Sequence, residues 1–222
     1  MANDDGTVCP DMSHTDTVEN WPVNDSFATI VADPPWPYTG TGPVGSGGRG
    51  GDGTTRDGRR IKQVAASEEY ALMDLTAIKE LSVGQVAAAN AHLYLWTTNG
   101  FLRQAHDVAE AWGFAPKTIL TWVKVQKDGR TPSMKTGYYY RSATEHIVFS
   151  VRGSLRLRGP CRPTVFYHPR LPHSVKPDSF MVMVKEQSPG PYLELFARRQ
   201  RPGWTAWGDE VRTMFPGCVP CL

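Results

Sequence analysis

One uninterrupted run, Asp33-Pro34-Pro35-Trp36, combines an acid, two prolines and a large aromatic ring. Neither proline has an N–H group, so the start of this turn offers only acceptors, namely the Asp33 carboxylate and the Pro34 carbonyl. These two acceptors can take both hydrogens of an exocyclic amine while the Trp36 ring stacks on the ring that carries it. Drawing the hydrogens out of the ring plane localises the nitrogen lone pair and makes a poor nucleophile reactive. The alternative interpretation is a proline-rich turn that Asp33 merely caps.

The element that must position this run is the apolar, β-branched segment 27–32, which the prolines end abruptly. Its composition predicts a buried strand that carries Asp33 to the carboxyl edge of a sheet, where α/β proteins bind their ligands. Further strands are expected at 92–97, 118–125, 145–151 and 193–196, and helices from Leu75 (capped by Asp74), at 101–112 and after Pro177. Strands that alternate with helices predict the α/β class, with a mainly parallel sheet covered by helices on both faces.

Length and composition favour a single globular domain. The chain has 222 residues, of which 40% are hydrophobic and 21% charged. We expect a domain over 26–215, an acidic and poorly ordered lead-in over 1–25, a mobile loop rich in Gly and Arg over 39–66, and a tail over 216–222. No apolar run approaches the roughly 18 residues of a membrane span, and the N-terminus lacks the features of a secretion leader. An intracellular protein without a membrane partner is therefore expected.

Two other patterns in the chain do not predict a site. Gly40-Thr41-Gly42-Pro43-Val44-Gly45 matches the dinucleotide-binding spacing, but Pro43 lies inside it and no helical pattern follows. The four cysteines are too scattered for a disulfide framework, and the pair Cys218 and Cys221 lacks the two further ligands of a zinc site. No metal is therefore expected.

Charge is distributed unevenly, although the formal net charge is only +2. No Lys or Arg precedes Arg49, whereas no Asp or Glu occurs between Val151 and Lys176. Arginine-rich stretches that also contain aromatic residues suit a polyanion, through phosphate contacts and base stacking. The alternative is an ordinary solvated surface. The candidate nucleic-acid contacts are Arg49, Arg56, Arg59, Arg60, Lys62 and Arg170.

The run at 33–36 resembles the motif of the MT-A70-like adenine N6-methyltransferases. Similar motifs follow in the family's order: Leu93-Tyr94-Leu95-Trp96-Thr97-Thr98-Asn99, Trp122-Val123-Lys124, Glu145, His173-Ser174-Val175-Lys176-Pro177, and Ser188 to Arg199, closing with Gly203-Trp204 and Trp207-Gly208. The similarity spans roughly residues 27 to 211.

This resemblance implies a Rossmann-like methyltransferase fold with permuted motif order and S-adenosylmethionine as cofactor. It implies that Asp33, Pro34, Pro35 and Trp36 are the catalytic residues, that Lys176 meets the cofactor's carboxylate and that Glu194 accepts hydrogen bonds from its ribose. Asp209 stands where the family often has Asn, and Asp16 is a further, divergent candidate for the adenine. The implied cofactor contacts are Asp33, Lys176, Glu194, Phe196, Arg198, Arg199, Gln200 and Asp209.

The expected reaction is in-line methyl transfer to N6 of a flipped-out adenine, with DNA favoured over RNA because the compact chain has no appended RNA-binding domain. Three alternatives stay open: methylation of cytosine N4, methylation of adenine in RNA, and an inactive homologue that acts as a nucleic-acid-binding scaffold. The sequence leaves open the recognition site, the biological role and whether the protein is a monomer or a dimer.

Overall fold

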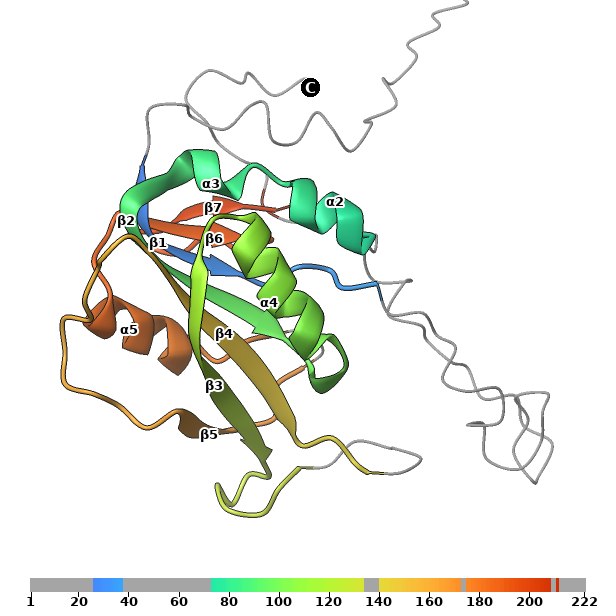
Figure 1. Ribbon diagram of the computed structural model, residues 1–222. Coiled ribbons are helices and arrows are strands. Elements are labelled where there is room, and N and C mark those ends of the chain that lie inside the picture. The colour runs from blue at the N-terminus through green and yellow to red at the C-terminus, as the bar shows by residue number, and fades with distance from the viewer. Residues whose placement is uncertain (1–25, 38–72, 134–139, 173–174, 209–210, 212–222) are drawn as a thin grey trace, which may run out of the picture.

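A computed structural model describes residues 26–37, 73–133, 140–172, 175–208 and 211. Its central feature is a seven-stranded sheet in the order β5-β3-β4-β2-β1-β6-β7 (Figure 1). The strands are β1 (Phe27–Ala32), β2 (Ala87–Thr97), β3 (Ala115–Val125), β4 (Thr144–Arg152), β5 (Val165–Pro169), β6 (Tyr192–Leu195) and β7 (Thr205–Trp207). The helices are α2 (Leu75–Glu80), α3 (Val83–Val86), α4 (Leu102–Ala111) and α5 (Asp178–Gln187), with a 3-10 turn, η2 (Asn99–Phe101), before α4.

The described sheet is mainly parallel, as the sequence predicts. β1 pairs in parallel with β2 and with β6, β6 with β7, and β3 with β5. Only β4 among the described strands runs in the opposite direction, antiparallel to both β2 and β3. The expected Rossmann-like α/β class is therefore confirmed, and the carboxyl ends of β1, β2, β3 and β6 meet at one edge of the sheet.

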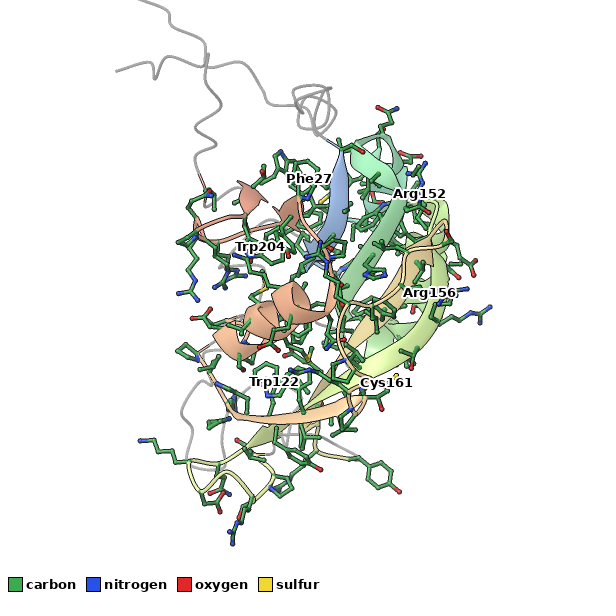
Figure 2. The ribbon with its side chains drawn as sticks, turned by 90° about the vertical axis from the view of Figure 1, so that its left-hand side faces the viewer. Phe27, Trp122, Arg152, Arg156, Cys161 and Trp204 are labelled. Carbon is green, nitrogen blue, oxygen red and sulfur yellow. The ribbon has the colours of Figure 1, made fainter. Side chains whose placement is uncertain are left out.

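Helices cover both faces of the sheet, so its central strands are buried on both sides. α2, α3 and α4 lie on one face, and α5 lies on the other (Figures 1 and 2). Along β2 the side chains alternate between the two cores: Leu93 and Leu95 pack toward α4, whereas Tyr94 and Trp96 pack toward α5. Burial on both faces explains why this strand is a continuous apolar run in the sequence.

Local signals placed the ends of most elements correctly, but β2 and β3 begin earlier than the expected starts at 92 and 118. The Asp74 carboxylate accepts a hydrogen bond from the Ala77 N–H and caps α2. The chain leaves α4 through Gly113, whose φ of +83° suits glycine. β6 ends one residue earlier than expected, because Phe196 has a φ of 60° and leaves the extended conformation. The sequence did not predict α3, β5 or β7.

Several expectations lie outside the described residues: the lead-in at 1–25, the loop at 39–66 and the tail at 216–222, with its cysteine pair. In the part of the chain that the structure describes, no helix is long and apolar enough to cross a membrane.

Candidate active site

Asp33 lies directly after β1, at the boundary between β1 and β6. Its backbone N–H donates to the carbonyl of Leu195, the last residue of β6 (3.5 Å). From β1 the chain continues into the helices of the α4 face, whereas β6 is entered from α5 on the opposite face. This change of face between neighbouring parallel strands is the usual place for a ligand crevice in an open α/β sheet. The predicted position of Asp33 is therefore confirmed.

A chain of alternating charges begins at Asp33. The Lys176 ammonium lies 2.7 Å from Oδ2 of Asp33 and 3.3 Å from Oε2 of Glu145. The second oxygen of Glu145 is paired with Lys124. The indoles of Trp96 and Trp122 lie under the two ammonium groups, 5.1 Å from Lys176 and 4.7 Å from Lys124. Two acids and two lysines thus compensate one another in a largely buried row.

The two acids of the row keep Lys176 charged. Burial lowers the pKa of Lys176, but the charges and hydrogen bonds of Asp33 and Glu145 outweigh it and raise this pKa above its ordinary value. Burial raises the pKa of Glu145, but Lys176 and Lys124 together hold it below its ordinary value. For Asp33, burial raises the pKa by more than Lys176 lowers it. The pKa of Asp33 therefore lies above its ordinary value, whereas that of Glu145 lies below its own.

The turn after Asp33 has a different architecture from the predicted one. Trp36 is only 2% exposed; its indole N–H donates to the Trp96 carbonyl (3.0 Å) and its ring stacks on Phe101. The expectation that Trp36 stacks on a substrate ring is therefore corrected, because the ring belongs to the core on the α4 face. The Pro34 carbonyl accepts the Trp36 backbone N–H (2.8 Å), and Pro35 accepts from Met73 (3.1 Å). A carbonyl has two lone pairs, so Pro34 keeps the capacity to accept a second hydrogen.

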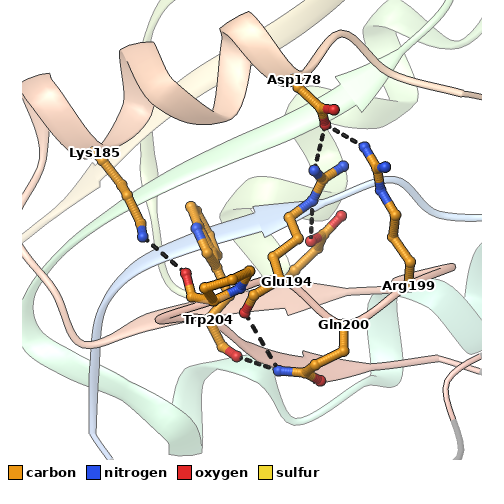
Figure 3. A network of polar contacts seen from close by, with 8 residues as sticks. Asp178, Lys185, Glu194, Arg199, Gln200 and Trp204 are labelled. Atoms are coloured by element: carbon orange, nitrogen blue, oxygen red, sulfur yellow. Dashed lines mark hydrogen bonds and ion pairs between the residues drawn. The ribbon is translucent and has the colours of Figure 1, made fainter.

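Glu194 lies on the neighbouring strand β6 and is paired with an arginine. Its Oε2 accepts from Nε of Arg201 (2.9 Å), and Arg201 also contacts Asp178 at the start of α5 (Figure 3). Burial raises the pKa of Glu194 by more than Arg201 lowers it. The sequence predicts the ribose hydroxyls as the partners of Glu194, whereas the structure adds a partner within the chain, Arg201, which offsets the cost of burying this acid.

The other implied cofactor contacts are spread along the segment after β6. The Phe196 ring packs edge-on against Trp207, with 5.6 Å between the ring centroids. Arg199 is paired with Asp178, and the Gln200 amide donates to the Trp204 carbonyl (2.7 Å). Arg198 is half-buried in the same segment. Asp209 and Asp16 lie outside the described residues.

Of the predicted nucleic-acid contacts, the structure describes Arg170. Arg170 is exposed, and its backbone N–H donates to the carbonyl of Val125, the last residue of β3. It therefore lies at the carboxyl ends of the parallel strands, as Asp33 does. Arg152, by contrast, ends the antiparallel strand β4 and lies at the opposite edge (Figure 2). Arg49, Arg56, Arg59, Arg60 and Lys62 lie outside the described residues.

Four charged residues of this edge were given no role from the sequence: Lys124, Glu145, Asp178 and Arg201. A signal existed for two of them, because Glu145 and Lys124 are charged residues at the ends of otherwise apolar strands, where burial without a partner is costly. Asp178 and Arg201 had no such signal, since neither lies in an apolar segment.

Comparisons of the sequence with known proteins identify the family. The family model described as MT-A70 matches residues 56–210. The type II methyltransferase M.MunI of a Mycoplasma species is 30% identical over 192 residues, which cover 83% of this chain and 78% of M.MunI. Human N(6)-adenine-specific methyltransferase METTL4 is 28% identical over 203 residues, covering 84% of this chain and 38% of METTL4. The N6-methyladenosine RNA methyltransferase MTA1 of Cryphonectria parasitica is 30% identical over 198 residues, which cover 83% of this chain and 52% of MTA1. The chain thus spans about half or less of the length of the last two relatives.

Proposed function

The chain belongs to the MT-A70 family of methyltransferases, and we propose that it transfers a methyl group from S-adenosylmethionine to the N6 amine of adenine in DNA. The observation that carries the proposal is the Asp33 carboxylate at the boundary of β1 and β6, beside a turn whose two prolines have no N–H. An amine is recognised by acceptors, and this turn presents acceptors.

The charged side chains fit the cofactor at two separate points. The Lys176 ammonium has three N–H donors, and its two carboxylate partners leave one for a third carboxylate. At the other end, Glu194 is an acceptor for the ribose hydroxyls. When bound, S-adenosylmethionine supplies a methyl group made electrophilic by a positively charged sulfur.

The residues of this chain orient the amine. Lys176 contacts Oδ2 of Asp33, so we assign Oδ1 and the second lone pair of the Pro34 carbonyl to the two amine hydrogens. Holding the nitrogen in line with the methyl group supplies much of the rate, because the reacting atoms no longer have to find each other. Trp36 contributes indirectly: its bond to the Trp96 carbonyl fixes the turn that carries both acceptors.

Adenine is supported by the names of two relatives, one N(6)-adenine-specific and one an N6-methyladenosine RNA methyltransferase. We propose DNA as the polymer on the similarity to M.MunI, a type II methyltransferase whose length this chain covers to 78%. In a duplex the base must leave the stack to reach Asp33, at a cost of a few kcal/mol.

The test is to incubate the chain with labelled S-adenosylmethionine and unmethylated DNA or RNA of mixed sequence, and then to identify the modified nucleoside by mass. We expect N6-methyldeoxyadenosine, and none with the Asp33→Ala variant. N4-methylcytosine would overturn the assigned base, product in RNA alone would overturn the polymer, and no cofactor binding in calorimetry would favour a scaffold.

A further inference from the structure

Arg201 bridges two acids that come from different elements. Its Nε lies 2.9 Å from Oε2 of Glu194 on β6, and its Nη1 contacts Oδ1 of Asp178 in the first turn of α5 (Figure 3). The side chains of Arg201 and Glu194 are only 15% and 16% exposed, whereas that of Asp178 is 63% exposed. The inner contact of Arg201 is thus shielded from solvent and the outer one is not.

The loop that carries Arg201 has supports that do not involve its guanidinium. The Lys185 ammonium donates to the Pro202 carbonyl (3.0 Å), and the Gln200 amide donates to the Trp204 carbonyl (2.7 Å). The Trp204 N–H also closes a turn onto the Arg201 carbonyl (3.2 Å). These bonds hold the backbone of the loop independently of the Arg201 guanidinium.

The bridge controls the geometry of Glu194. A guanidinium is planar and presents its donors in a rigid fork, so contact through both Nε and Nη1 fixes the direction from which it meets a carboxylate. Arg201 contacts Oε2 of Glu194, which assigns Oε1 to a ligand. The Arg201 charge also opposes the effect of burial, which raises the pKa of Glu194 and would favour a neutral carboxyl.

We infer that Arg201 is a positioning residue for the cofactor: anchored on Asp178, it holds Glu194 so that the second carboxylate oxygen, Oε1, accepts hydrogen bonds from the ribose diol. The inference rests on the proposed function, since the ribose is that of S-adenosylmethionine. It predicts that Arg201 contributes to affinity only when the ligand has ribose hydroxyls. The opposite arrangement, in which Arg201 blocks the acid and competes with the ribose, predicts tighter binding when Arg201 is removed.

The test combines a protein change with a ligand change. Binding of S-adenosylhomocysteine and of its 2′,3′-dideoxy analogue is measured by calorimetry for the wild type and for Arg201→Gln. We expect Arg201→Gln to weaken S-adenosylhomocysteine about 10- to 100-fold, the range for hydrogen bonds to a charged group. The dideoxy analogue should bind the two proteins equally. Asp178→Asn should give a smaller loss with the same ligand dependence, because it removes only the exposed anchor.

Lys185→Met is the matched control, because Lys185 supports the same loop without contacting Glu194. It should leave both affinities unchanged. Thermal unfolding of each ligand-free variant shows whether the fold is retained, and Arg201→Lys, which keeps one charge on the loop, replaces Arg201→Gln if the latter does not fold.

The outcomes separate the inference from the proposed function. If the wild type binds neither ligand, the cofactor assignment fails and the inference fails with it. If the wild type binds and methylates, but Arg201→Gln binds with unchanged or higher affinity, Arg201 does not position Glu194. An equal loss for both ligands would mean a general structural role and would also overturn the inference.

Discussion

The two ends of the site are built on the same plan with different cations. Each end has a carboxylate on one of two neighbouring parallel strands: Asp33 follows β1, and Glu194 lies in β6. Each carboxylate shares a cation with a second acid. At the Asp33 end the cation is Lys176, and at the Glu194 end it is Arg201.

The difference between the cations matches the tasks of the two ends. An ammonium is a point charge with three rotatable donors on a flexible stem, whereas a guanidinium is a rigid fork. In the proposed mechanism Asp33 accepts an incoming amine and then releases the product. A lysine can adjust to both states while it keeps its contact with Glu145. In the same mechanism Glu194 binds the cofactor ribose in one arrangement, which suits a partner of fixed geometry.

The sharpest test of the separate roles proposed for Asp33 and Glu194 is a pair of isosteric substitutions. Asp33→Asn should lower kcat about 100- to 1,000-fold, the cost of removing one aligned polar group from a reacting centre, with a much smaller change in cofactor affinity. Glu194→Gln should weaken the cofactor about 10- to 100-fold and, at saturating cofactor, lower kcat far less. Calorimetry and steady-state kinetics measure both quantities. If both variants mainly lowered kcat, or if both mainly weakened cofactor binding, the two ends would not be functionally separate.

The lysine end should also be the more important of the two for stability. Glu145→Gln leaves two largely buried ammonium groups with one carboxylate fewer, so we expect the free energy of unfolding to fall by about 3 kcal/mol in urea titration. The exposed pair of Glu186 and Arg162 is the control, because Glu186→Gln should cost less than about 1 kcal/mol. Equal costs would show that the row at the lysine end is effectively solvated.

Trp36→Phe tests whether this tryptophan acts through the fold rather than on the base. The change leaves the Trp96 carbonyl without its indole donor, and we expect a loss of about 1 to 3 kcal/mol together with reduced kcat. Trp112→Phe removes the same kind of bond, to the Ile78 carbonyl on the α4 face, and should cost similar stability without lowering kcat. A stable Trp36→Phe variant that had lost only nucleic-acid binding would restore the stacking role.

The smallest expected effect is a displacement of the pH profile. In the proposed role Asp33 accepts the amine most strongly when it is ionised. Its pKa is raised by burial, so kcat should fall on acidification at a pH above the ordinary value of 3.8. Glu145 contributes to that rise, so Glu145→Gln should move the acid limb to lower pH. The measurement is kcat against pH at saturating cofactor. A limb that moved to higher pH would mean that another group controls it.

Short-range chemistry made parts of this protein predictable. The β-branched segment before Asp33, the Asp74 cap and the glycine that ends α4 each act on a few neighbouring residues, so the sequence indicates them directly. β5 and β7 carried no comparable signal. β5 is an edge strand with alternate residues exposed, and β7 has three residues, so each exists because a neighbouring strand supplies its hydrogen bonds.

The residue types of the motif at 33–36 determine which groups this turn offers. It has a carboxylate and carbonyl oxygens as acceptors, and its two prolines have no N–H to donate. Packing between distant segments settled the rest. It turned Trp36 inward to the Trp96 carbonyl. It also brought the Lys176 ammonium to the Glu145 carboxylate, and the Arg201 guanidinium to the Glu194 carboxylate. The physical reason is range, because a cap or a proline acts on its neighbours, whereas a buried charge is compensated only by a partner that folding brings to it.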